Sequence, residues 1–93
     1  MWRAPGSSVE RSVSVVFPAY NEAEGIAAAI EDFFACPAVD EIVVVDNNSS
    51  DATPAIVAET RARLVRETRQ GYGFALRRGL AEAKGDYVIL AEP

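Results

Sequence analysis

The chain has 93 residues, of which 49% are hydrophobic and 25% are charged, and its formal net charge is −5. This length suits one small domain, and the acidic balance excludes a general nucleic-acid binder, which would present a basic face. One cysteine and no histidine exclude an intrachain disulfide framework and a Cys/His zinc site, which fits a reducing, cytoplasmic location.

Residues 1–11 (MWRAPGSSVER) contain no apolar core of a signal peptide, and we expect them to form a flexible leader. No run of the chain approaches the ~20 apolar residues that a membrane span requires. We therefore expect a soluble chain without a membrane span.

The first strand is expected at residues 12–17 (SVSVVF), which are short, apolar and β-branched. Pro18 is expected to stop this strand. A helix should follow over residues 20–37, with Asn21 as its N-cap and with acids in its first turn, where the helix dipole favours them. Pro37 ends the helix.

The second strand is expected at residues 41–45, whose uniform run IVVV suits a parallel strand that is covered on both faces. The next helix should begin at Asp51 or Thr53, with Pro54 near its first position. A third strand is expected at residues 62–67 (ARLVRE).

Residues 68–73 (TRQGYG) are expected to form a loop, and a third helix should run from Phe74 until Gly85 stops it in the left-handed conformation. The face of this helix that we expect to be buried contains Leu76, Leu80 and Ala83. The fourth strand is expected at residues 86–91 (DYVILA).

This β-α-β-α-β-α-β order predicts an α/β fold with a mainly parallel sheet. Ligands of such sheets bind beyond the carboxyl ends of the strands. The polar segments that follow the strands should therefore converge at one site. These segments are residues 18–22, residues 46–51, residues 69–73 and Glu92.

Two of these segments contain side chains that suit a nucleoside. The ring of Tyr20 could stack on a base, and Glu22 offers hydrogen-bond acceptors. The alternative is that this segment only ends a strand and begins a helix. Asp46 could accept a hydrogen bond from a base or a ribose, or it could belong to a turn. For Asp51 the helix cap is favoured.

The glycine-rich loop allows its backbone to approach a ligand closely. A dinucleotide fingerprint G-x-G-x-x-G would require glycine where Leu76 stands, and no G-x-x-x-x-G-K-[ST] loop is present. Both nucleotide-binding motifs are thus excluded. Arg77 and Arg78 are expected on the solvated face of the helix. Glu92, after the last strand, could bind a hard cation such as Mg²⁺ or Mn²⁺.

The segments VSVVFPAYNEAEGI, EIVVVDNNSSDATPAI and RQGYGFALRRGLAEAKGDYVILAEP together resemble the N-terminal half of the family 2 glycosyltransferases with the GT-A fold. The pattern is most similar to the dolichyl- or polyprenyl-phosphate mannose synthase-like branch. The resemblance extends from Val13 to Pro93. It implies the nucleotide-binding half of a Rossmann-like GT-A domain, here residues 12–93.

The resemblance also implies roles for individual residues. Glu92 would take the place of the first acid in the family's D-x-D metal motif, with Mg²⁺ or Mn²⁺ as the cofactor. The residues implied in binding the nucleotide-sugar are Pro18, Ala19, Tyr20, Asn21, Glu22, Asp46, Asn47, Gly71 and Gly73. Asn47 and Arg69 depart from the family, which often has Asp and Asn at these positions.

The resemblance further implies the transfer of a sugar from a UDP- or GDP-linked donor to an unidentified acceptor. One candidate acceptor is a lipid phosphate at the cytoplasmic face of a membrane. The catalytic residues are unknown and are expected downstream of Pro93, so this donor-binding part should be inactive alone. The alternative is a small non-catalytic binding or receiver-like module. A receiver would require acids after the first strand, where Phe17 and Pro18 stand.

Overall fold

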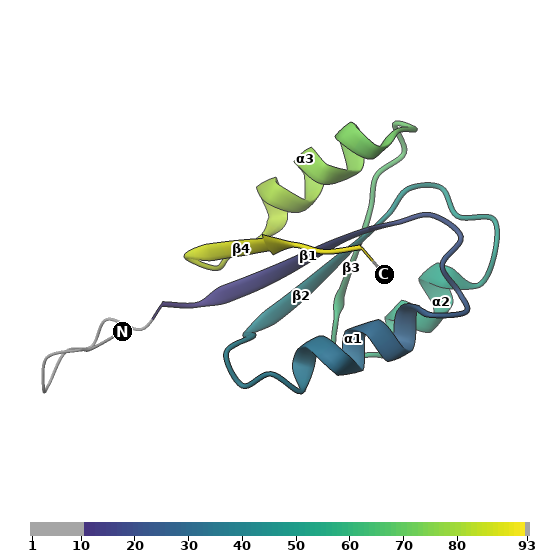
Figure 1. Cartoon of the computed structure of the whole chain (residues 1–93). Coiled ribbons are helices and arrows are strands. Elements are labelled where there is room, and N and C mark those ends of the chain that lie inside the picture. The colour runs from purple at the N-terminus through teal and green to yellow at the C-terminus, as the bar shows by residue number, and fades with distance from the viewer. Residues whose placement is uncertain (1–10, 93) are drawn as a thin grey trace, which may run out of the picture.

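The computed structural model describes residues 11–92, so the expected leader lies outside the described residues except for Arg11. The elements are β1 (Val13–Ala19), α1 (Ile26–Phe34), β2 (Glu41–Asp46), α2 (Thr53–Ala58), β3 (Arg63–Arg66), α3 (Tyr72–Glu82) and β4 (Tyr87–Leu90). All strand pairs are parallel, and the spatial order is β3-β2-β1-β4 (Figure 1). The predicted α/β fold and element order are confirmed.

The sheet lies between two layers of helix, with α1 and α2 on one face and α3 on the other (Figure 1). Successive residues of β1 serve these two layers alternately, as a strand of period two requires. Phe17 belongs to the core under α1 and α2, where its ring meets Phe33 edge to face at 5.3 Å, and Val16 belongs to the core under α3. Both faces of the central strands are therefore buried.

Helix α3 packs on the sheet through its small residues and not through the predicted leucines. Ala75 and Gly79 are buried, whereas Leu80 is 46% exposed. A Cβ atom added to Gly79 would lie 2.3 Å from Cγ1 of Val16. Only glycine at position 79 permits α3 to come this close to Val16. The helix therefore packs on the sheet with the face that contains Ala75 and Gly79, and Leu80 lies on its exposed side.

The first strand extends past Pro18, contrary to the prediction that proline stops it. Val16 accepts a hydrogen bond from Ala91 on the β4 side, and Pro18 faces that same side two residues later. The last β1–β4 pair joins Val16 and Leu90. The missing N–H of Pro18 therefore lies beyond the last β1–β4 residue pair, so it removes no hydrogen bond from the four pairs that hold β4.

Two predicted helix boundaries were wrong. Asn21 does not cap α1, because it has a left-handed φ of 52° and the helix begins five residues later, at Ile26. Gly85 does not take the predicted left-handed conformation, because among the described glycines a positive φ occurs only at Gly71. Glycine is required at position 85 because an added Cβ would lie 2.7 Å from the backbone nitrogen of Ser14.

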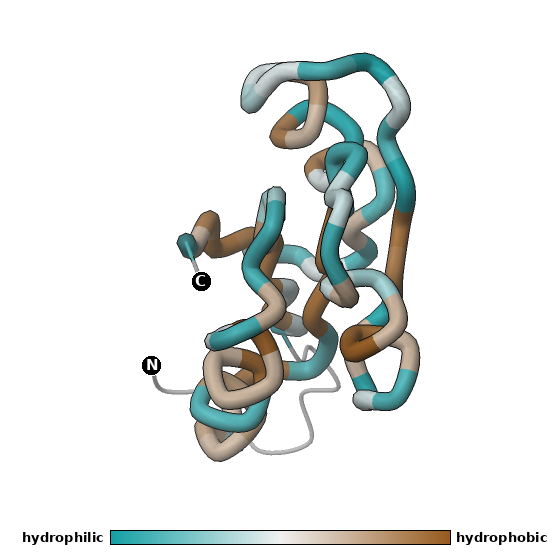
Figure 2. Tube along the Cα trace, turned by 90° about the vertical axis from the view of Figure 1, so that its right-hand side faces the viewer, coloured by the Kyte–Doolittle hydropathy of each residue, from teal (hydrophilic) through white to brown (hydrophobic). Residues whose placement is uncertain are grey.

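Strand β4 forms one edge of the sheet, and each of its four residues is exposed. In Figure 2 the segment that leads to the C-terminal label is brown, which marks hydrophobic residues. The opposite edge strand, β3, instead carries Arg63, whose guanidinium pairs with Glu82 on α3 at 2.9 Å. Among residues 11–92, no helix combines the length and the apolar character needed to cross a membrane.

Candidate functional site

The segments that follow the four strands meet at the carboxyl end of the sheet, as predicted, and enclose a hollow of about 360 Å³. The residues that line it are Pro18, Ala19, Tyr20, Glu22, Asn47, Gln70, Tyr72, Ala75 and Glu92. A larger hollow of about 700 Å³ lies between α1 and α2. None of its lining residues follows the carboxyl end of a strand, so the smaller hollow is the candidate site.

The structure brings most of the predicted site residues together. Six of the predicted residues line the hollow, and these are Pro18, Ala19, Tyr20, Glu22, Asn47 and Glu92. Gly71 and Gly73 line a separate hollow of about 230 Å³ with Phe74 and Arg77. Asn21 and Asp46 line neither hollow, and their contacts within the protein explain why.

Asn21 ties the loop after β1 to the loop after β2. Its backbone N–H donates to Ser49 Oγ at 2.9 Å, and its Oδ1 accepts from the backbone N–H groups of Ser50 at 2.8 Å and Asp51 at 3.3 Å. Asparagine tolerates the left-handed backbone that this contact requires. Its amide oxygen thus faces a neighbouring loop and not the hollow.

The same two loops are joined by Asp51 and Thr53. Asp51 Oδ1 accepts from the backbone N–H of Thr53, and Thr53 Oγ1 accepts from the backbone N–H of Glu22 at 2.9 Å. The hydrogen bond from Thr53 Oγ1 is the main reason why the pKa of Asp51 lies below its ordinary value. These contacts fix the backbone of Glu22 and leave its carboxylate for the hollow.

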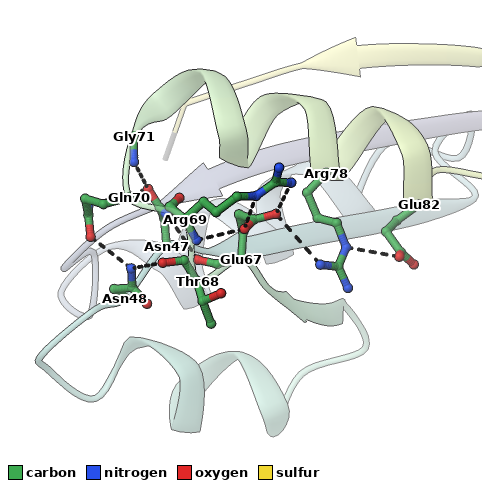
Figure 3. A network of polar contacts seen from close by, with 9 residues as sticks. All are labelled: Asn47, Asn48, Glu67, Thr68, Arg69, Gln70, Gly71, Arg78 and Glu82. Atoms are coloured by element: carbon green, nitrogen blue, oxygen red, sulfur yellow. Dashed lines mark hydrogen bonds and ion pairs between the residues drawn. The ribbon is translucent and has the colours of Figure 1, made fainter.

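Asn47 ties the end of β2 to the loop between β3 and α3 (Figure 3). Its Nδ2 donates to the carbonyl oxygens of Glu67 at 2.8 Å and Arg69 at 2.9 Å, and its Oδ1 accepts from the backbone N–H of Gly71 at 2.9 Å. Its own backbone N–H donates to Ala19. An ionised aspartate lacks donors, so the amide that departs from the family pattern is required by this loop.

Glu67 holds the other side of that loop and was not predicted. It is 3% exposed, and its Oε2 accepts from the backbone N–H of Arg69 at 2.8 Å and from Arg69 Nε at 3.2 Å. These hydrogen bonds lower the pKa of Glu67. Arg78 was expected to be solvated, but its Nη1 lies 3.8 Å from Glu67 Oε1 and its Nε lies 3.2 Å from Glu82 Oε2 (Figure 3). The sequence signal that could have identified Glu67 is an acidic residue directly after a strand.

Asp46 is 2% exposed and lies at the end of β2. It follows Val44 at the two-residue spacing of one strand face, and Val44 belongs to the core under α1 and α2. Its Oδ2 accepts from the backbone N–H of Ser49 at 3.2 Å. Within residues 11–92, its Oδ1 is the one buried side-chain polar atom without a hydrogen-bond partner.

Two carboxylates, those of Glu22 and Glu92, line the hollow. No group of three His, Cys, Asp or Glu residues that could hold a metal occurs within the described part of the chain. Mg²⁺ is usually bound by one or two carboxylates together with substrate phosphates. The donor set therefore fits a cation that binds together with a phosphate-bearing ligand.

Three further residues line the hollow. Gln70 and Tyr72 belong to the segment 69–73 that was predicted to converge there, although neither was named as a site residue, and Ala75 was not predicted. Tyr72 stands between the two glycines that were predicted, in the sequence QGYGFA. The two glycines predicted a close backbone approach to a ligand, and no role was predicted for the aromatic ring between them. Since Tyr72 opens α3, its position depends on where that helix begins.

The proteins that this chain resembles in sequence are glycosyltransferases. The family model described as glycosyl transferase family 2 matches residues 14–92. A low-salt glycan biosynthesis hexosyltransferase of Haloferax volcanii is 36% identical over 89 residues, which are 92% of this chain and 22% of that protein. An uncharacterized glycosyltransferase of Mycobacterium tuberculosis is 42% identical over 81 residues, which are 87% of this chain and 36% of that protein.

Solved structures resemble the fold as well. Glucosyl-3-phosphoglycerate synthase from Mycobacterium tuberculosis, in complex with Mn²⁺ and UDP-glucose, is 35% identical with a TM-score of 0.78, over 88% of this chain and 33% of that chain. Mannosyl-3-phosphoglycerate synthase from Rubrobacter xylanophilus is 30% identical with a TM-score of 0.82, over 88% of this chain and 30% of that chain. The chain thus spans about a third of these structures.

Proposed function

The chain belongs to glycosyl transferase family 2, and we propose that residues 12–93 form the part of a glycosyltransferase that binds the nucleotide-diphosphosugar donor. The observation that carries this proposal is the hollow at the carboxyl end of the sheet, to which the segments after all four strands contribute. It combines an aromatic ring at Tyr20 with carboxylates at Glu22 and Glu92. These groups suit a base, a ribose and a cation with its phosphates.

Within this proposal, each segment has one task. Pro18, Ala19 and Tyr20 border the nucleoside, and Asn47 holds the loop whose glycines, Gly71 and Gly73, lie near the donor. Glu22 and Glu92 would hold Mg²⁺ or Mn²⁺. When bound, such a cation stabilises the negative charge of the departing nucleoside diphosphate. The contribution of this chain is thus to bind and orient the donor.

Among the two donor classes that were predicted, we favour a UDP-linked sugar. The solved synthase with 35% identity was crystallised with UDP-glucose and Mn²⁺, and a related complex also contains phosphoglyceric acid. A GDP-linked donor and a lipid-phosphate acceptor at the cytoplasmic face of a membrane are the further possibilities to test. The family match favours all of these over the receiver-like alternative.

The acceptor site and the catalytic base are proposed to lie in the remainder of a longer protein. The support is that the chain spans 22% to 36% of the relatives described above. The 93-residue chain is therefore expected to bind the donor nucleotide weakly and to show no turnover by itself.

Calorimetric titration of the chain with UDP and with GDP, each with and without Mn²⁺, tests this proposal. We expect heat of binding for UDP that increases with Mn²⁺. Glu92→Gln should remove the Mn²⁺-dependent part, because a neutral amide replaces a carboxylate ligand. Glu59→Gln is the matched control, since Glu59 is exposed and does not line the hollow. Absence of binding for both nucleotides in a folded sample would contradict the proposal.

A further inference from the structure

A second tyrosine, Tyr72, borders the candidate site in addition to the predicted Tyr20. Tyr72 is the first residue of α3 and is 57% exposed, and Tyr20 follows β1 and is 52% exposed. Both line the hollow of about 360 Å³. The hollow therefore carries an aromatic ring on the β1 side and another at the start of the helix that covers β1 and β2.

The backbone on which each ring stands is held by hydrogen bonds. Gly71, directly before Tyr72, has φ of 137° and donates its N–H to Asn47 Oδ1 at 2.9 Å. Asn21, directly after Tyr20, donates its N–H to Ser49 Oγ at 2.9 Å. The two rings are thus exposed side chains on fixed backbone, which lowers the conformational cost of binding a ligand between them.

The other exposed large hydrophobic residues do not share this position. Those of β4, such as Tyr87 at 53% exposure, lie on the edge strand, and Leu80 lies on the outer face of α3. Of all the exposed large hydrophobic residues in the described part of the chain, only Tyr20 and Tyr72 line the hollow. Exposed rings at a hollow suit a flat apolar ligand surface, such as that of a nucleobase.

We propose that Tyr72 is a specificity-determining residue whose ring packs on the nucleobase of the donor from the α3 side, while Tyr20 borders the base from the β1 side. This inference rests on the proposed function, and it adds the residue that recognises the planar part of the ligand. Stacking of an aromatic side chain on a base changes affinity by about 10-fold to 100-fold. Because each base has a flat face, the contact selects a nucleotide over a bare diphosphate.

The test measures the binding of UDP and of inorganic pyrophosphate, both with Mn²⁺, to the 93-residue chain and its variants. Tyr72→Ala should weaken UDP binding by about 10-fold to 100-fold and leave pyrophosphate binding unchanged. Tyr72→Phe keeps the ring and should bind UDP as the wild type does. Tyr87→Ala removes a similarly exposed tyrosine outside the hollow and should change neither affinity.

Two results would overturn the inference while leaving the proposed function intact. One is that Tyr72→Ala binds UDP as tightly as the wild type. The other is that it loses UDP and pyrophosphate affinity equally, which would indicate a disturbed start of α3 and not a lost contact with the base. If the folded wild-type chain binds no nucleotide, the proposed function and this inference both fail, so the two failures are distinguishable.

Discussion

The polar side chains at the two ends of the sheet differ in whether their hydrogen-bond partners lie within the protein. At the amino end, the fully buried Ser14 donates its hydroxyl to Glu41 Oε2 at 2.6 Å and accepts from the backbone N–H of Gly85 at 2.8 Å. At the carboxyl end, Asp46 Oδ1 is buried without a hydrogen-bond partner among residues 11–92, and the carboxylates of Glu22 and Glu92 line a hollow. The polar groups at the amino end are paired with one another, whereas at the carboxyl end the carboxylates of Glu22 and Glu92 line the hollow that a ligand can enter.

The largest expected effect concerns the amino end of the sheet. Gly85→Ala would place a Cβ 2.7 Å from the backbone nitrogen of Ser14 and 3.0 Å from the carbonyl oxygen of Tyr87. Because backbone atoms cannot move aside cheaply, we expect the free energy of unfolding to fall by about 2–3 kcal/mol, as measured by urea denaturation.

Gly73→Ala is the matched control for this change. An added Cβ at Gly73 meets no atom within 4 Å, and the residue lies in α3. Alanine is the better helix former, so stability should stay equal or rise by up to about 1 kcal/mol. If Gly85→Ala were as stable as the wild type, the close contact at the amino end would be disproved.

Ser14→Ala should lower the free energy of unfolding by about 1–2 kcal/mol, because it leaves the partly buried N–H of Gly85 without its acceptor and removes a donor to Glu41. Urea denaturation of Ser14→Ala, of Glu41→Gln and of the double variant measures the coupling of the two side chains. Strictly additive losses would show that the hydroxyl and the carboxylate act independently.

Asp46→Asn tests the carboxyl end of the sheet, where we expect little change in the free energy of unfolding. The change removes a charge from a buried position where one oxygen has no partner, so the free energy of unfolding should change by less than about 0.5 kcal/mol or rise slightly. Because Asp46 does not line the hollow, UDP affinity measures whether its Oδ1 becomes accessible when the donor binds, and a fall of at least about 10-fold would show that a ligand N–H bonds to it. An unchanged affinity would exclude Asp46 from the donor site.

The smallest expected effect is on the pH dependence of stability. Burial of Glu41 opposes its ionisation, but hydrogen bonds from Ser14 and the backbone of Lys84 and the charge of Arg63 outweigh it, so its pKa lies below 4.5. The unfolded chain then binds more protons than the folded one as the pH falls through this range. Stability is present above about pH 4.5 and is lost below it.

Glu41→Gln should therefore make the free energy of unfolding less dependent on pH below about 4.5, with less than one proton removed from the slope. The pKa values of Glu67, Glu82 and Asp86 are lowered as well, so most of the acid sensitivity remains. Denaturation curves at several pH values would measure this, and an identical slope in the variant would contradict the assignment.

Much of the fold was predictable because it depends on local signals. The apolar, β-branched run after Glu41 specified a buried parallel strand, and the same reasoning located the four strands along the chain. The convergence of Tyr20, Asn47 and Glu92 followed from the rule that parallel strands end at one edge. The buried face of α3 was not predictable, since it depends on the space left by Val16 above Gly79.

The sequence by itself determined the order of the elements, the parallel sheet and the segments that meet at its carboxyl end, because these follow from periodicity and chain connectivity. Only the tertiary structure decided what each polar side chain does there. Asn21 and Asn47 bind neighbouring loops, Tyr72 reaches the hollow, and Asp46 keeps one oxygen unpaired. The physical reason is that hydrogen-bond partners of loop residues lie about 20 to 30 positions away in the chain, and only folding brings them within reach.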